Sequence, residues 1–270
     1  EQAAALLKSK IHPTKIALGF QIAALKAEEI LLDMGVKVDE DILNLVAQTA
    51  MTGKSAEADK EHLAAICVEV AMAADIEDIN IVQRPNGKVR ESTAIAGLLL
   101  DGEKLDHAMP DAVQDPKIGL IAADIDVPDY AQQLNVQLKD NSGVKDFIDS
   151  RNAQLVEIGE RLIKTGMNVL FCSREVHPAV IEHLAANNAY AVRRVRKSDM
   201  EALSKATGAR IVMNIDTFST KDLGTAGLLE EVSIGERPMI KITDTPNKST
   251  VSVLVRAPTH HVVEEIKRAF

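Results

Sequence analysis

Residues 189–214, AYAVRRVRKSDMEALSKATGARIVMN, contain the pattern that decides the fold class. The stretch at 191–195 is predicted to be a short extended strand, and the apolar run at 211–213 predicts a second one. Between them, apolar residues at helical spacing predict a helix that ends at Gly208, since glycine readily adopts the positive φ of a helix C-terminus. Two strands joined through a helix run parallel in one sheet. The chain is therefore predicted to have an α/β fold, with parallel strands flanked by helices.

The start of this helix carries its own signal. Ser198 is followed three residues later by Glu201, which is the spacing of a capping box. In that motif each side chain accepts a hydrogen bond from the backbone N–H near the other, so the helix is predicted to start at Asp199.

Outside this stretch, the sequence predicts further strands at 117–122 and 168–171, separated by helices. The connection at 124–166 is far longer than a crossover requires, and such connections tend to be functional. Apolar residues at gaps of three and four within it predict a helix over about 142–164, about 35 Å long at 1.5 Å per residue. Part of that helix is expected to project beyond the sheet, although a long helix packed on the core fits the same residues.

The stretch before residue 101 predicts two more extended segments. A strand at 78–83 is followed by the turn residues at 84–87, and Val89 onward is predicted to return as the second strand of a hairpin. The run at 95–100 predicts another single apolar strand.

Composition places the chain among ordinary globular proteins, with 46% hydrophobic and 26% charged residues. The net charge of −9 argues against a phosphate-backbone partner, so no nucleic acid is expected. No apolar run approaches the roughly 18 residues of a membrane span, so no membrane partner is expected. Cys67 and Cys172 each lie in an apolar run, which indicates buried thiols in a reducing compartment. We therefore expect a cytoplasmic protein.

The triplet Gly53-Lys54-Ser55 is the ending of a phosphate-binding P-loop. That motif also needs a glycine five residues before Gly53, where this chain has Gln48, and it follows a strand rather than a helix. The triplet is therefore not a P-loop.

No catalytic or metal-binding arrangement is evident in the sequence. His260 and His261 are adjacent, whereas the paired histidines of a zinc helix are four residues apart, so no metal is expected. No combination of Ser, His and Asp or of Cys and His has usable spacing, so no catalytic residue is assigned.

Four segments resemble one family. They are VRRVRKSDMEALSKATGARIV, IHPTKIALGFQIAALKAEEIL, AMTGKSAEADKEHL and RAPTHHVVEEIKRAF. Each is similar to a segment of the group II chaperonins, the thermosome family of archaea and its eukaryotic cytosolic relatives. The resemblance spans nearly all of the chain and implies an apical α/β domain with a helical protrusion, and a smaller, mostly helical intermediate domain with a few strands.

The resemblance also implies domain boundaries. Residues 1–32 would be a helical remnant of the equatorial domain, residues 33–88 and 248–270 the two parts of the intermediate domain, and residues 89–247 the apical domain with a protrusion at about 138–165. The chain does not begin with Met and lacks the glycine-rich ATP-binding loops of the family, so we expect a segment of a longer protein.

In this family a turn at the start of the intermediate domain senses the γ-phosphate of ATP. The matching residues here are Thr52, Gly53 and Lys54, and a lysine suits the role because its flexible cationic head pairs reversibly with phosphate. The full-length protein would use ATP and Mg²⁺ in a double ring of chaperonin subunits. This chain alone is not expected to bind either cofactor or to hydrolyse ATP, because phosphoryl transfer needs groups that it lacks.

The resemblance further implies a groove for unfolded or partly folded polypeptides and a built-in lid. The groove would be formed by the helix at 177–188 and the irregular loop before the protrusion, with Tyr130, Val180, Ile181, His183, Leu184 and Asn187. The lid tip would be formed by Val144, Phe147 and Ile148. For Ile181 and Leu184, core packing explains the residues equally well.

One departure from the family concerns a hinge. Ala257-Pro258 stands where the family has paired glycines, and proline fixes φ, so the joint is expected to be stiffer. Two other functional readings stay open: an unrelated α/β enzyme domain for a small ligand, and a divergent chaperonin homologue with a role in assembly only.

Overall fold

The computed structural model describes residues 2–53, 57–127, 141–235 and 237–270, with the backbone alone at Gln2, Glu77 and 141–149. The chain divides into two units, Glu1–Leu43 and Asn44–Phe270.

The first unit is helical. It contains α1 (Gln2–Lys8) and α2 (Pro13–Met34), and α3 (Glu40–Met51) begins in it and ends in the second unit. Asp39 caps α3, since its Oδ1 accepts a 2.9 Å hydrogen bond from the Ile42 N–H. No residue of α2 is buried, and Phe20 is 55% exposed.

Sheet A of the second unit has strand order β1-β12-β2. β12 (Val251–Ala257) runs parallel to β1 (Ile79–Pro85) and antiparallel to β2 (Thr93–Ala96). Helices α4 (Lys60–Ala73) and α9 (His260–Ala269) share a hydrophobic core with these strands. All seven residues of the central strand β12 are buried, because both of its faces are covered. Val253 and Val255 pack against α4 and α9, and Leu254 packs in a cluster with residues of sheet B.

Sheet B has strand order β3-β11-β10-β4 and is antiparallel throughout. Its strands are β3 (Leu98–Asp101), β11 (Arg237–Thr243), β10 (Leu228–Ile234) and β4 (Ala112–Gln114).

Sheet C confirms the predicted parallel sheet. β7 (Tyr190–Val192), β6 (Val169–Cys172), β5 (Lys117–Ile121) and β8 (Ile211–Val212) lie side by side in parallel, and β9 (Gly224–Thr225) adds an antiparallel partner to β5.

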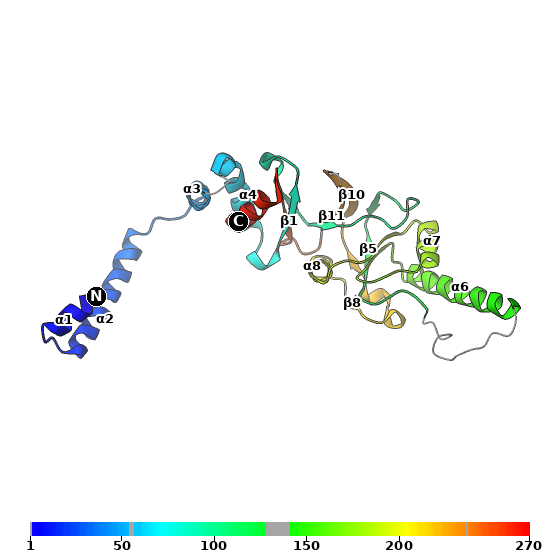
Figure 1. Cartoon of the computed structure of the whole chain (residues 1–270), viewed down its shortest axis with the longest axis horizontal. Coiled ribbons are helices and arrows are strands. Elements are labelled where there is room, and N and C mark those ends of the chain that lie inside the picture. Colours follow the sequence, from blue (N-terminus) through cyan, green and yellow to red (C-terminus); the bar gives the residue numbers. More distant parts are fainter. Residues whose placement is uncertain (1, 54–56, 128–140, 236) are drawn as a thin grey trace. The chain divides into compact units, whose positions relative to one another are not determined.

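The two faces of sheet C are covered by different elements. Helices α6 (Asn141–Lys164) and α7 (Pro178–Ala186) pack on one face, and sheet B with α8 (Lys197–Thr207) packs on the other. Helices α6 and α7 lie next to each other (Figure 1). Their apolar side chains share a core with Ile121, Leu170 and Cys172. Alternate residues of the same strands point the other way, as the two-residue period of a strand requires. They meet sheet B and α8 in a second core.

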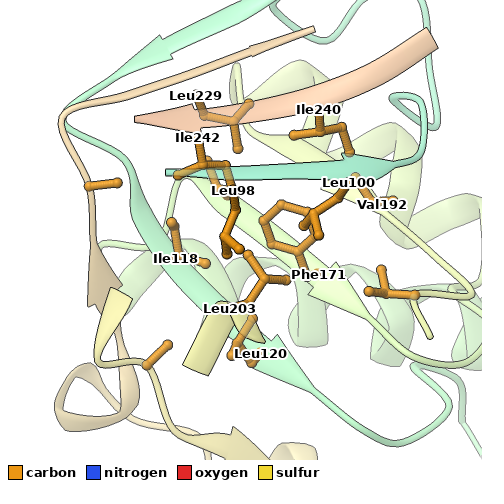
Figure 2. Packing of buried hydrophobic residues seen from close by; sticks show 14 of the residues in the cluster. Leu98, Leu100, Ile118, Leu120, Phe171, Val192, Leu203, Leu229, Ile240 and Ile242 are labelled. Carbon is orange, nitrogen blue, oxygen red and sulfur yellow. The ribbon is translucent and has the colours of Figure 1, made fainter. Parts of the chain in front are cut away.

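Figure 2 shows this second core, in which the Phe171 ring lies among residues from both sheets and α8. The labelled residues are Leu98, Leu100, Leu229, Ile240 and Ile242 from sheet B, Ile118, Leu120, Phe171 and Val192 from sheet C, and Leu203 from α8. Five short 3-10 helices complete the described elements: Glu57–Asp59, Ile76–Asp78, Val89–Glu91, Ile215–Thr217 and Thr220–Asp222.

The start of α8 differs from its prediction. The helix begins at Lys197, its N-cap Arg196 makes no side-chain cap hydrogen bond, and Ser198 Oγ donates to Asp199 Oδ1 instead of serving as a cap. The Arg196 Nε lies 2.9 Å from Asp199 Oδ2, so this ion pair holds the first turn in place of a capping box. The predicted end is confirmed, with Gly208 at φ 76°.

The segment before residue 101 also differs. No hairpin forms at 84–89, because β1 pairs with the distant β12 and residues Val89–Glu91 form a 3-10 helix. The predicted single strand at 95–100 is two strands in two different sheets, separated at Gly97, whose φ is 123°.

Candidate functional site

Helix α7 is the element in which the sequence predicts a binding groove. His177 caps it, since its Nδ1 accepts a 3.2 Å hydrogen bond from the Ala179 N–H, and Pro178 occupies the first turn, where no amide partner is needed. At the other end the Asn187 side chain donates a 2.8 Å hydrogen bond to the His183 carbonyl. Both ends of this short helix are therefore fixed by side chains.

Val180, Ile181 and Leu184 face inward from α7. Val180 and Leu184 are fully buried and Ile181 is 9% exposed, and all three belong to the core that α7 shares with α6 and sheet C. Positions i, i+1 and i+4 of a helix lie on one face, so these three apolar side chains are buried together. In this conformation they stabilise the fold, and a ligand at the surface does not reach Val180 or Leu184.

The other two residues predicted on α7 lie nearer the surface. His183 is half-buried and packs closely against α6. A Cβ added to Gly159 of α6 would lie only 2.8 Å from the Cδ2 atom of His183. Its Nε2 is 3.3 Å from the exposed Asn187 side-chain nitrogen. His183, Asn187 and the exposed Glu182 give this side of α7 a polar surface beside α6.

The remaining predicted groove and lid residues are less fully described. Tyr130 lies outside the described residues. Val144, Phe147 and Ile148 lie on the first two turns of α6, where only the backbone is described. The predicted long helix is confirmed over Asn141–Lys164, about 36 Å at 1.5 Å per residue.

The turn after α3 contains the predicted nucleotide-sensing residues. Lys54 lies outside the described residues. Thr52 Oγ1 donates a 2.9 Å hydrogen bond to the Gln48 carbonyl, and Gly53, at φ 77°, donates its N–H to Glu57 Oε2 at 3.1 Å. These contacts close the helix end and leave Thr52 and Gly53 adjacent on an exposed turn.

Neither cysteine is prepared for nucleophilic chemistry. Burial raises the pKa of Cys172 to about 11 and that of Cys67 to about 12. Both thiols are therefore protonated at neutral pH. The described residues contain no group of three metal-binding side chains that could hold an ion, and no described helix is long and apolar enough to cross a membrane.

Two features that sequence analysis did not identify lie where sheets A and B meet. Ser252, fully buried in β12, accepts a hydrogen bond from the Leu99 N–H and donates one to the Gly97 carbonyl, both 2.9 Å long. Arg84 of β1 forms an ion pair with Asp101 of β3. Neither pairing has a local sequence signal, because the partners are far apart in the chain.

Comparisons with known proteins agree with this architecture. Residues 1–270 match the model of the TCP-1/cpn60 chaperonin family. The thermosome subunit beta of Methanothermobacter thermautotrophicus is 38% identical over 271 residues, which cover 98% of this chain and 50% of that protein. The thermosome subunit beta of Archaeoglobus fulgidus is 37% identical over 281 residues, covering 99% and 52%.

A solved structure is also similar: the open-state monomer of a group II chaperonin from Methanococcoides burtonii. It has a TM-score of 0.76 and 32% identity, over 99% of this chain and 64% of that one. The chain thus spans about half the length of the curated relatives that it matches.

Proposed function

Because the chain belongs to the TCP-1/cpn60 chaperonin family, we propose that it is the part of a molecular chaperone that binds non-native polypeptides and supplies the lid of an ATP-driven folding chamber. The observation that carries this proposal is the family match along the whole chain, together with an α/β body that bears the 24-residue helix α6. The other two readings, a small-ligand enzyme domain and an assembly-only homologue, have no specific observation in their favour.

The proposal includes the domain assignment. Sheet A with α4 and α9 would be the intermediate domain, and sheets B and C with α6, α7 and α8 the apical domain. This assignment differs from the expected boundary at residue 89, because β2 (Thr93–Ala96) belongs to sheet A. Support comes from the chain path, which enters sheet A through β1 and β2, builds the other two sheets, and returns to sheet A through β12. A domain interrupted in this way is suited to transmit motion to the one inserted into it.

We place client binding on the exposed side of α7 and at the tip of α6. His183 and Asn187 offer polar contacts there, and Tyr130, Val144, Phe147 and Ile148 would add apolar ones. Such a mixed surface suits weak binding to many sequences, because no single contact dominates. Ile181, at 9% exposure, would contribute at the edge, whereas Val180 and Leu184 would stay in the core.

We assign nucleotide sensing to Lys54, held on the turn that Thr52 and Gly53 form. ATP and Mg²⁺ would be bound by the full-length protein, working in the cytoplasm as a multi-subunit double ring without nucleic acid or membrane partners. Alone, this chain would bind clients without hydrolysing ATP.

Capture of a chemically unfolded client by the purified chain, with and without ATP, tests the proposal. We expect a molar excess of the chain to suppress client aggregation equally in both conditions, and to leave the same client unbound when it is native. The variant Phe147→Ser should weaken suppression, because it removes an apolar side chain from the proposed tip, whereas Glu201→Gln on the exposed side of α8 should not. Equal binding of native and unfolded client, or no suppression at all, would contradict the proposal.

A further inference from the structure

A small cavity lies where the end of β1 meets the turn between β10 and β11. It has a volume of about 320 Å³ and is lined by Arg84, Pro85, Asn86, Ile234, Gly235 and Arg237. β1 belongs to sheet A, whereas β10 and β11 belong to sheet B, so the cavity lies between two sheets. None of the residues assigned to client binding or nucleotide sensing lines it.

Two arginines at this place are mostly removed from water. The Arg84 side chain is 12% exposed and the Arg256 side chain 8% exposed. Arg84 pairs with Asp101, and Arg256 lies 3.2 Å from Glu91 Oε2. Yet Arg84 Nε and Arg256 Nη1 are both buried without a hydrogen-bond partner among the described residues. A buried N–H is costly unless a ligand or a water molecule accepts its hydrogen bond.

The Arg256 guanidinium does not line the cavity but lies close to two residues that do. It donates to the Asn86 carbonyl at 3.3 Å, and a Cβ added to Gly235 would lie 3.2 Å from Nη1. Asn86 and Gly235 both line the cavity. Because Gly235 has no side chain, the backbone turn approaches the guanidinium closely.

Arg237 adds a third positive charge at the opening. It is exposed, and no carboxylate in the described part of the chain pairs with it. Burial lowers the pKa of Arg84, and the positive charges of Arg237, Arg196 and Arg256 lower it further, although Asp101 pairs with Arg84. A negative charge in the cavity would relieve this repulsion, and arginines are well suited to bind oxyanions because several of their N–H groups can donate at once.

We propose that this cavity is a binding site for a phosphate or pyrophosphate group, held by Arg84 and Arg237 with Arg256 behind them. The volume lies at the low end of the roughly 300–1,000 Å³ typical of ligand pockets, which favours a small anion. An anion there contacts residues from both sheets and stabilises the arrangement in which they are packed together. This inference does not depend on client capture, and either can fail without the other.

Calorimetric titration of the whole chain with phosphate and with pyrophosphate, against chloride at equal ionic strength, tests the site. We expect saturable binding of at least one anion, at least tenfold weaker in Arg237→Gln, whose side chain is exposed and not needed for folding. Arg174→Gln, another exposed arginine outside the cavity, is the matched control and should bind as the unmodified chain does. Further titrations with ATP and with ADP, in the absence of metal, show whether the site binds a free anion or the phosphate tail of a nucleotide.

Glu236 lies next to Arg237 in the sequence, so the chain carries a negative charge directly beside this arginine. Glu236→Gln should therefore bind phosphate at least as tightly as the unmodified chain. Equal binding by the unmodified chain and Arg237→Gln would overturn the proposal. So would the absence of binding in both the unmodified chain and Glu236→Gln.

Discussion

The buried hydroxyl of Ser252 donates a 2.9 Å hydrogen bond to the carbonyl of Gly97. Gly97 is the residue at which one extended run separates into β2 of sheet A and β3 of sheet B. The same hydroxyl accepts from the Leu99 N–H, so one side chain satisfies two backbone groups beside the break.

Replacing Ser252 with alanine should leave both backbone groups unpaired in a buried place. We expect Ser252→Ala to lower the free energy of unfolding by about 1–3 kcal/mol, measured by urea denaturation. Ser233→Ala on the exposed side of β10 is the control and should change it by less than about 0.5 kcal/mol. Equal effects of the two variants would mean that the paired hydroxyl contributes nothing specific.

Gly97 itself should not tolerate a side chain. Its φ is 123°, and an added Cβ would lie 2.1 Å from the Ile242 carbonyl oxygen. Gly97→Ala should therefore cost at least the roughly 1–3 kcal/mol of a strained backbone conformation. Gly19→Ala, in helix α2 with nothing within 4 Å, should instead stabilise its helix by up to about 1 kcal/mol. Thermal unfolding followed by circular dichroism compares the two, and a neutral Gly97→Ala would contradict the close approach.

The Lys205 Nζ of α8 lies 3.3 Å from Asp78 Oδ1. Asp78 directly precedes β1, and both residues line a cavity of about 250 Å³. The lysine side chain is 60% exposed, and solvent therefore screens the pair. A double-mutant cycle with Lys205→Met and Asp78→Asn should give a coupling energy of about 0.2–1 kcal/mol that falls with added salt. A coupling above about 2 kcal/mol that does not respond to salt would show a desolvated pair instead.

Leu184 should behave as a core residue. Leu184→Ala is expected to lower the free energy of unfolding by about 2–5 kcal/mol, because it leaves a cavity between α7 and sheet C. Glu182→Ala, on the exposed face of the same helix, should change it by less than about 0.5 kcal/mol. If Leu184→Ala instead lowered the free energy of unfolding only slightly but strongly reduced client capture, Leu184 would belong to the binding surface.

Stability should fall in alkaline solution through the cysteines. Burial raises the pKa of Cys172 from 9.0 to about 11, so between these values the unfolded thiol loses its proton and the folded one keeps it. This contribution is fully present below pH 9 and is lost as the pH rises toward 11, by up to about 1.4 kcal/mol per pH unit.

Denaturation of the unmodified chain and of Cys172→Ala at several pH values measures this contribution. The difference between their unfolding free energies should shrink as the pH rises above 9, the unfolded pKa of the thiol. Cys172 is a sharper test than Cys67, because Cys172 is fully buried and Cys67 only partly so. A difference independent of pH would contradict a protonated buried thiol.

The parts of the fold that local patterns specify were predictable. The β-α-β unit, whose helix ends at Gly208, and the long helix α6 both follow from periodicity and helix termini. The capping box at Ser198 was wrong because Arg196 and Asp199 form a competing ion pair in the same turn. A short-range motif of this kind has alternatives that only the three-dimensional surroundings decide.

Pairings between distant segments were not predictable in this way. The strand at Ile79–Pro85 has a turn after it, which favours a hairpin, yet its partner is β12 near the end of the chain. The prediction of the candidate groove had the same limit. Helical spacing identified the apolar face of α7, but it did not show that Val180 and Leu184 are buried against sheet C. Burial depends on what the rest of the chain places beside a helix.

The central position of β12 in sheet A sets an order for folding during synthesis. β1 and β2 leave the ribosome early but cannot complete their sheet until Val251–Ala257 has followed them. At roughly 5–20 residues per second, they wait on the order of ten seconds. Sheets B and C need only segments made within that interval. The inserted sheets can therefore fold first, while the edges of β1 and β2 stay unpaired in the nascent chain.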